Sequence, residues 1–119
     1  MRVVFDNNTV LFDTDNWIVL TREPFAYGPF ESRAAAQQYA ERTKRTDSII
    51  VAWYEPEWVC EGCPPAFGAV WFNGSWDNSF VAGPFYDIAD AVNCYGNGRP
   101  GMAVELDEFP EDDDCAAAV

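Results

Sequence analysis

The tripeptide Gly-Pro-Phe occurs twice, as Gly28-Pro29-Phe30 and as Gly83-Pro84-Phe85, and these two stretches, 55 residues apart, decide the predicted fold. Each is followed by a segment that opens with a good helix N-cap, Ser32 in the first copy and Asp87 in the second. Both residue types cap helices because a short side-chain oxygen accepts hydrogen bonds from the first-turn amides. Each copy therefore predicts an extended segment, a Gly-Pro turn and a capped helix.

Apolar runs rich in β-branched and aromatic residues flank each copy, and such runs are typical of strands. In the second copy, two of them are separated by Asn73-Gly74-Ser75, and Asn-Gly between apolar runs indicates a hairpin. In the first copy, an Asp-Thr-Asp-Asn turn over 13–16 is expected to separate two strands. The predicted helices span about 32–45 and 87–95, and the predicted strands span 2–5, 10–12, 17–21, 48–54, 69–72, 76–82 and 102–106.

The chain thus predicts an α+β fold in which two degenerate ββαβ repeats form an antiparallel sheet, with two helices on one face. Its 119 residues suit one domain. We expect this domain to cover 1–110, with repeat one at 1–54, a linker at 55–65, repeat two at 66–108 and a flexible acidic tail at 111–119. In the second helix, the residues expected to face the core are Ile88, Ala91, Val92 and Tyr95, which have helical spacing.

The segment Tyr27-Gly28-Pro29-Phe30-x-Ser32-Arg33-x-x-Ala36 resembles the helix entry of SPOR domains. That resemblance implies four antiparallel strands backed by two helices and binding to septal peptidoglycan, although the 55-residue spacing is too long for the halves of one SPOR domain. The segment also resembles one in small acidic, tryptophan-rich accessory proteins of actinobacterial tailed phages. We favour this second resemblance, which implies a phage accessory protein acting in the host cytoplasm and names no target.

Composition excludes several classes of function. The chain has 20 Asp plus Glu against 7 Lys plus Arg, a net charge of −13 and no histidine. Without histidine, Ser-His-Asp and Cys-His catalysis and imidazole zinc sites are excluded, and the charge argues against direct nucleic-acid binding. No carboxylate pair stands out as catalytic, so we expect no enzyme.

No apolar run reaches the length of a secretory signal or the roughly 20 residues of a membrane span, so we expect a cytoplasmic protein without a membrane partner.

Four cysteines suggest a structural staple. Two of them form Cys60-Glu61-Gly62-Cys63, and a C-x-x-C pair is found in zinc sites, redox pairs and disulfides. Redox chemistry is disfavoured because Pro64-Pro65 follows where a helix should begin. A short disulfide and free thiols remain open, as does one zinc ion held by Cys60, Cys63, Cys94 and Cys115. We expect no other cofactor.

Aromatic residues crowd the segment before the C-x-x-C pair. Trp53 and Tyr54 are adjacent in a predicted strand, so they face opposite sides and one of them must leave the main core. Trp58 follows closely. Because exposed aromatics often anchor interfaces, Trp53 and Trp58 are candidate partner-binding residues.

The charge is unevenly distributed along the chain. Residues 1–59 hold nine acidic and six basic side chains, whereas residues 60–119 hold eleven acidic and one basic. An acidic surface of this kind attracts basic partners. It can equally serve only to keep the protein soluble. The candidate partner-binding carboxylates are Asp107, Glu108, Glu111, Asp112, Asp113 and Asp114.

The leading hypothesis is a non-enzymatic module that binds a basic protein surface and inhibits a host nucleic-acid-binding protein by mimicking nucleic acid. One alternative is a cysteine-stapled structural module that uses an aromatic surface. Another is a SPOR-like peptidoglycan binder.

Overall fold

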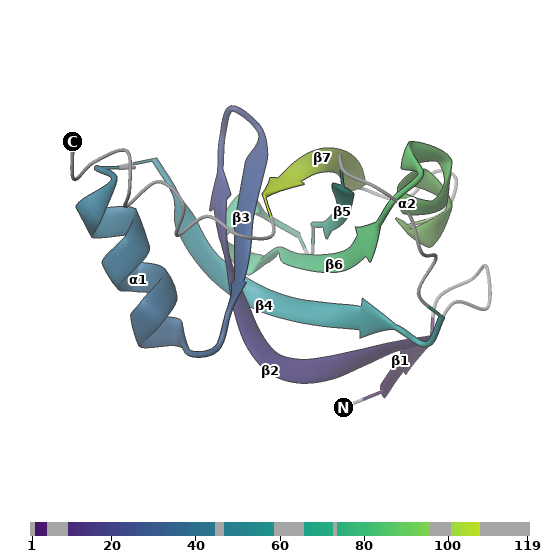
Figure 1. Ribbon diagram of the computed structural model, residues 1–119. Coiled ribbons are helices and arrows are strands. Elements are labelled where there is room, and N and C mark those ends of the chain that lie inside the picture. Colours follow the sequence, from purple (N-terminus) through teal and green to yellow (C-terminus); the bar gives the residue numbers. More distant parts are fainter. Residues whose placement is uncertain are drawn as a thin grey trace.

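The computed structural model describes residues 2–4, 10–44, 47–58, 66–72, 74–95 and 101–107. Within them, none of the helices is long and apolar enough to cross a membrane. The elements are β1 (Arg2–Val4), β2 (Val10–Thr21), β3 (Phe25–Phe30), α1 (Arg33–Arg42), β4 (Ile49–Pro56), β5 (Ala66–Trp71), a 3-10 turn (Trp76–Asn78), β6 (Phe80–Phe85), α2 (Ile88–Tyr95) and β7 (Gly101–Asp107), as drawn in Figure 1.

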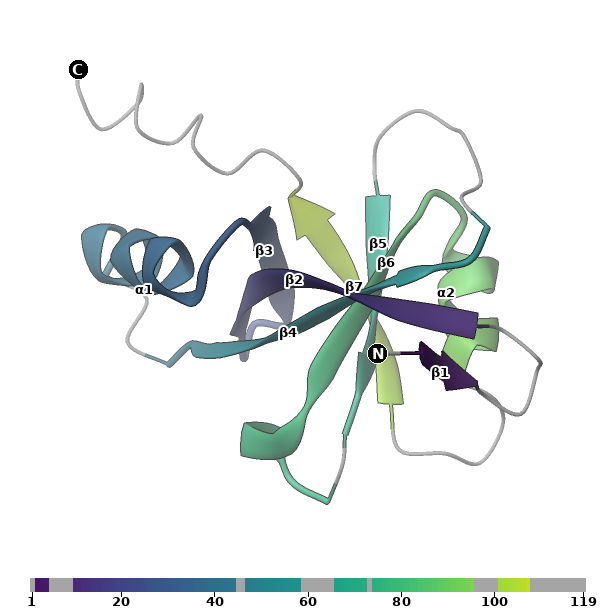
Figure 2. The ribbon, with the colours of Figure 1, turned by 90° about the horizontal axis from the view of Figure 1, so that it is seen from below.

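The sheet closes on itself into a barrel. Its strands follow one another in the order β2-β3-β7-β5-β6-β4, and β4 pairs again with β2, so six strands form a complete ring. The short strand β1 is added to the first residues of β2, where Val4 lies opposite Val10. Figure 2, seen from below, shows the strands crossing one another steeply, as a strongly twisted closed sheet requires.

The α+β class is confirmed, but the expectation of an antiparallel sheet is wrong. Pairing is antiparallel within each half of the chain, where β2 pairs with β3 and β4, and β5 pairs with β6 and β7. The halves are joined by two parallel pairings, β3 with β7 and β4 with β6. Hairpin signals report only on neighbours in sequence, so they gave no sign of these long-range parallel pairs.

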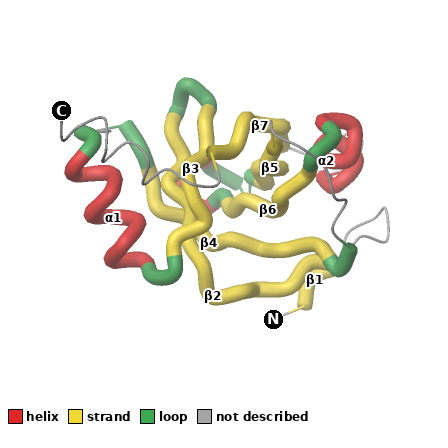
Figure 3. Tube along the Cα trace, viewed as in Figure 1, coloured by secondary structure: helices red, strands yellow, loops and turns green. Residues whose placement is uncertain are grey.

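The helices also differ from expectation, because they do not share one face of the sheet. Helix α1 packs on β2, β3 and β4, whereas α2 packs on β5, β6 and β7. Figures 1 and 3 show them at opposite ends of the barrel. Each helix covers the strands of its own half, and closure turns the outer faces of the two halves away from each other.

Both predicted N-caps are confirmed in position. Ser32 is extended and its Oγ accepts a hydrogen bond from the Ala35 amide at 3.0 Å. Asp87 Oδ1 likewise accepts from the Ala89 amide at 2.9 Å. These side chains satisfy amides that have no partner inside the helix, which fixes where α1 and α2 begin.

The predicted turn at 13–16 lies inside one strand. β2 runs through it with a register irregularity between Asp13 and Asn16 against β4. Asp15 has φ 59°, and its amide donates to Asp13 Oδ1 at 2.9 Å. The turn-forming residues therefore produce a bulge, which bends the long strand without ending it.

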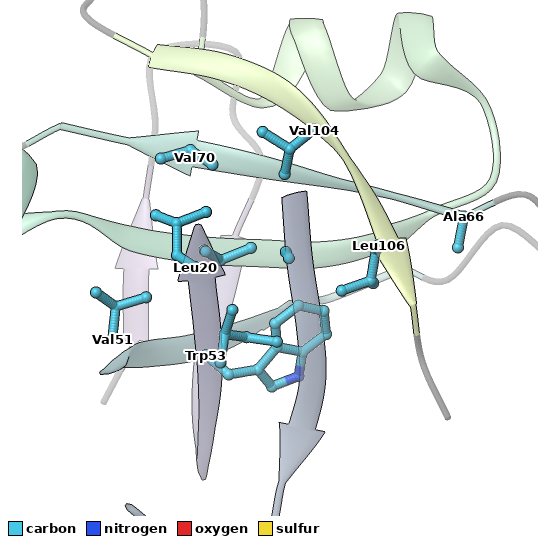
Figure 4. Close-up of a cluster of buried hydrophobic side chains, with 10 residues drawn as sticks. Leu20, Val51, Trp53, Ala66, Val70, Val104 and Leu106 are labelled. Atoms are coloured by element: carbon cyan, nitrogen blue, oxygen red, sulfur yellow. The ribbon is translucent and has the colours of Figure 1, made fainter. Parts of the chain in front are cut away.

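Three apolar layers stabilise the structure. The largest fills the barrel lumen, and Figure 4 shows its side chains converging from the surrounding strands. A second layer lies under α1 and a third under α2. The lumen residues come from all six barrel strands and are Ile18, Leu20, Ala26, Val51, Trp53, Ala66, Val70, Val81, Val104 and Leu106.

Helix α2 buries a different stripe from the one predicted. Ala91 is buried as expected, but Ile88 is 52% and Val92 39% exposed, and Cys94 is buried in their place. Ala91 and Cys94 pack in the layer beneath α2, which includes Ala69, Ala82 and the ring of Phe85. The larger Ile88 and Val92 are left on the outer flank. The side chain of Tyr95 lies outside the described residues.

Candidate functional site

The predicted acidic site is described only where it begins. Asp107 ends β7, opposite Tyr27 of the parallel strand β3. On this strand Val104 and Leu106 are buried in the lumen, and Glu105 between them is exposed on the outer wall. Glu108, Glu111, Asp112, Asp113 and Asp114 lie outside the described residues, as does the predicted tail over 111–119.

The basic side chains gather at one end of the barrel. Four of the five described cations lie on α1 or in the turns beside it, namely Arg22, Arg33, Arg42 and Lys44. The described residues between 66 and 107 include no Lys or Arg, and their carboxylates are Asp77, Asp87, Asp90, Glu105 and Asp107. These carboxylates are spread over both ends of the barrel. Asp87 and Asp90 lie at α2, whereas Asp107 lies opposite Tyr27 of the layer under α1, and Asp77 follows Trp76, which Arg22 covers.

Trp53 is not a surface residue, which corrects the expectation that it contacts a partner. Its exposure is 0%, because it faces the lumen together with Val51. Its indole nitrogen donates to Glu55 Oε1 at 3.5 Å. The neighbouring Tyr54 points outward and packs on Phe80, with ring centroids 4.8 Å apart.

Trp58, the second predicted aromatic, is at the surface. It is 41% exposed, and its ring lies 5.8 Å from that of Phe85, centroid to centroid. Phe85 packs in the same layer as Ala91 of α2. Trp58 therefore lies beside the helix and remains a candidate anchor.

All five large apolar side chains that are exposed in the described part of the chain belong to elements at one end of the barrel. They lie on β1, at the start of β2, just after β4 and on α2, which Figures 1 and 2 both show opposite α1. They are Val4 (60% exposed), Phe12 (41%), Trp58 (41%), Ile88 (52%) and Val92 (39%). Because Leu11 packs in the layer under α2, its neighbour Phe12 lies on the opposite side of the strands, as does Val4. We call the other three residues, Trp58, Ile88 and Val92, the α2-end surface.

A groove beside α1 was not anticipated from the sequence. Two adjoining pockets, of about 450 and 580 Å³, share Lys44 and Ser48. Their lining carries three cations, Arg22, Arg33 and Lys44, and three carboxylates, Glu23, Glu41 and Asp47. Two of the cations also lie over aromatic rings, Arg33 over Trp17 and Arg22 over Trp76. Balanced charges give this groove no preference for an anion or a cation.

The bulge in β2 places a carboxylate beside a phenol. Burial, together with the Asp13 carboxylate, raises the pKa of Tyr54. A phenol with a raised pKa is a weaker acid, so even less of it is present as phenolate at neutral pH. Since Asp13 also accepts a hydrogen bond from the Asp15 amide, its role here is to shape the bulge.

The cysteine hypothesis rests on residues of which only Cys94 is described; Cys60, Cys63 and Cys115 fall outside the described residues. In the part of the chain that the structure describes, no three His, Cys, Asp or Glu side chains come together to hold a metal. Burial in the apolar layer under α2 raises the pKa of the Cys94 thiol from 9.0 to about 12. In the absence of a metal this thiol is protonated at neutral pH.

Cys94 is therefore expected to be chemically inert in the folded protein. In a variant carrying Ser at positions 60, 63 and 115, a disulfide reagent at about pH 8 should leave the native thiol unmodified and react with it in urea. Between about pH 9 and 12, the unfolded chain loses this proton while the folded chain keeps it, so the free energy of unfolding should fall as pH rises through this range. Equal modification rates for the native and unfolded protein would contradict the burial.

No protein-family model, curated protein or solved structure matches this chain.

Proposed function

We propose that this protein is a non-enzymatic binding module that docks on a basic surface of another protein through its acidic second half. The observation that carries the proposal is the one-sided charge: the described residues between 66 and 107 include five carboxylates and no Lys or Arg. Asp77 and Asp87 are exposed, as is Glu105 on the outer wall. A surface of one sign attracts partners of the opposite sign and accelerates their encounter.

A basic protein surface commonly exists to bind phosphates, so its natural ligand is often nucleic acid. A folded protein that presents spaced carboxylates competes for the same cations without being nucleic acid itself. The proposed action is therefore inhibition by occupancy, which needs no catalytic group. Action in a host cytoplasm as a phage accessory protein is part of this proposal, on the strength of the Gly-Pro-Phe resemblance.

The alternatives receive less support. A closed six-stranded barrel differs from the four-stranded antiparallel sheet that a SPOR domain implies, so we do not propose peptidoglycan binding. A zinc staple has only Cys94 among the described residues, so no geometry supports it. Of the two tryptophans predicted to form an aromatic contact surface, Trp58 is 41% exposed and Trp53 is buried.

The charge proposal predicts salt-dependent, competable binding. Proteins captured from a host lysate at about 50 mM salt should be released at about 300 mM, since screening shortens the reach of surface charge. Duplex DNA or RNA should displace them. The double variant Asp87→Asn/Asp90→Asn, at α2, should weaken binding of a purified captured partner several-fold, while the matched variant Glu31→Gln/Asp47→Asn, near α1, should not. Binding that ignores salt, or equal losses in both variants, would refute the proposal.

We also propose that the two halves are structural repeats of one ββαβ unit. Each consists of a hairpin, a capped helix and a third strand that pairs with the first strand of the hairpin. The cross-half pairings are equivalent too, because each joins the second strand of one half to the third strand of the other. Exchanging the halves leaves this pattern of pairings unchanged.

Strand registers support the same equivalence in the lumen. Leu20 lies opposite Ala26 in the first hairpin, as Val70 lies opposite Val81 in the second. By the same registers, Gly68 is the counterpart of Ile18. In the first half, the large Ile18 is combined with the small Ala26. In the second half, the small Gly68 is combined with the larger Val81.

This size exchange can be tested with a double-mutant cycle. A Cβ at position 68 would lie 2.8 Å from Val81 Cγ1, so Gly68→Ala should cost about 1–3 kcal/mol of unfolding free energy. Adding Val81→Ala puts at position 81 the residue found at its counterpart, Ala26, and should relieve the clash. The double variant should therefore lose about 1 kcal/mol less unfolding free energy than the two single variants lose together. Val104→Ala is the matched control, because Val104 Cγ2 is 3.6 Å from that Cβ and its effect should add. Urea unfolding measures all three, and additivity at Val81 would contradict the predicted exchange.

A further inference from the structure

We propose that the α2-end surface is the contact site for the partner, and that the part of the partner it holds is a basic amphipathic helix. This inference rests on the proposed function and identifies the site and the partner's chemistry.

The apolar centre of the surface is a pair of residues one helical turn apart. Ile88 and Val92 are spaced i, i+4 on α2, so their side chains lie on the same side of the helix. Their exposed fractions are 52% and 39%, and Trp58 adds a ring that is 41% exposed beside the same helix. Single exposed apolar residues are ordinary, but every large one in the described residues falls at this end of the barrel.

The packing of α2 explains why this pair remains outside. Ala91 and Cys94 occupy the side of the helix that meets the wall and are 0% and 2% exposed. Ile88 and Val92 lie outside this contact and are exposed. Their apolar area is therefore available to another molecule.

Carboxylates border this apolar centre. Asp87 and Asp90 flank Ile88 on α2, and Glu57 directly precedes Trp58. The only cation described on the elements of this end is Arg2 of β1. An apolar stripe bordered by Lys and Arg is complementary to this arrangement, because the stripe covers Ile88 and Val92 while the cations meet the carboxylates.

Closure of the sheet indicates that the partner docks through side chains. An extended peptide joins a sheet at a free strand edge. All six barrel strands have neighbours on both sides, and the one described strand with a neighbour on a single side is β1, which is three residues long. A helix laid against the i, i+4 ridge of α2 needs no edge, and ridges of one helix pack into grooves of another. A second copy of this acidic chain would bring like charges together and is disfavoured.

The test uses a labelled 18-residue peptide of Lys and Leu, with Leu at helical spacing on one face. One control peptide has the same composition but scattered Leu, and another contains Lys without Leu. We expect the amphipathic peptide to bind about tenfold more tightly than either control, with an affinity that falls as salt is added.

Two pairs of variants locate the contact. Ile88→Ala/Val92→Ala keeps helix propensity and should weaken binding about tenfold, as expected when anchors are truncated, whereas Gln38→Ala on the exposed face of α1 should not. Glu57→Gln/Asp90→Asn should weaken binding several-fold, and Glu31→Gln/Asp47→Asn, which changes net charge equally near α1, should not. Circular dichroism of each variant verifies that the fold is intact.

The outcomes separate this inference from the proposed function. Equal binding of the amphipathic peptide and the scattered-Leu peptide, or unchanged binding by the folded Ile88/Val92 variant, would overturn the α2-end site while leaving a charge-driven function standing. Failure of every basic peptide to bind would overturn both. A dimer of the free protein that the Ile88/Val92 variant abolishes would make a second copy the occupant and would also overturn the inference.

Discussion

Two parallel strand pairings, β3 with β7 and β4 with β6, hold this structure together, and everything else about it depends on them. Each joins strands from different halves of the chain. Without them, each half is a three-stranded antiparallel sheet with two unpaired edges and its inner face exposed. With them, those inner faces meet in one lumen, where Trp53 contributes the largest buried side chain. Closure of the barrel therefore pairs the edge strands of the two halves and forms the core at the same time.

The same closure organises the surface. It turns the outer faces of the two halves apart, so α1 and α2 lie at opposite ends (Figure 3). Cations gather around α1, while α2 combines carboxylates with the exposed pair Ile88 and Val92. The proposed contact site follows from this separation. Side chains fill the lumen of the barrel, so a partner can bind only to its outer surface.

Much of the local structure could be predicted from the sequence. The N-caps Ser32 and Asp87 mark where the helices begin, because capping depends on residues next to each other in the chain. The parallel pairings could not be predicted, since they join distant strands and leave no local pattern. Periodicity was only partly right on α2: it predicted Ala91 at the core correctly, but the structure buries Cys94 as well and leaves Ile88 and Val92 exposed. Strand alternation required Trp53 and Tyr54 to face opposite sides, but only the assembled barrel decides which of them enters the lumen.

The central claim is that neither half is complete without the other. The most direct measurement compares residues 1–58 and 66–119, expressed as separate polypeptides, alone and mixed in equal amounts, by amide NMR dispersion and sedimentation. The account predicts that neither half folds as a monomer, because its β3 and β4, or its β6 and β7, lack their neighbours. The mixture should form a one-to-one complex with the spectrum of the intact chain. A half that folds as a stable monomer would contradict closure as the basis of this structure.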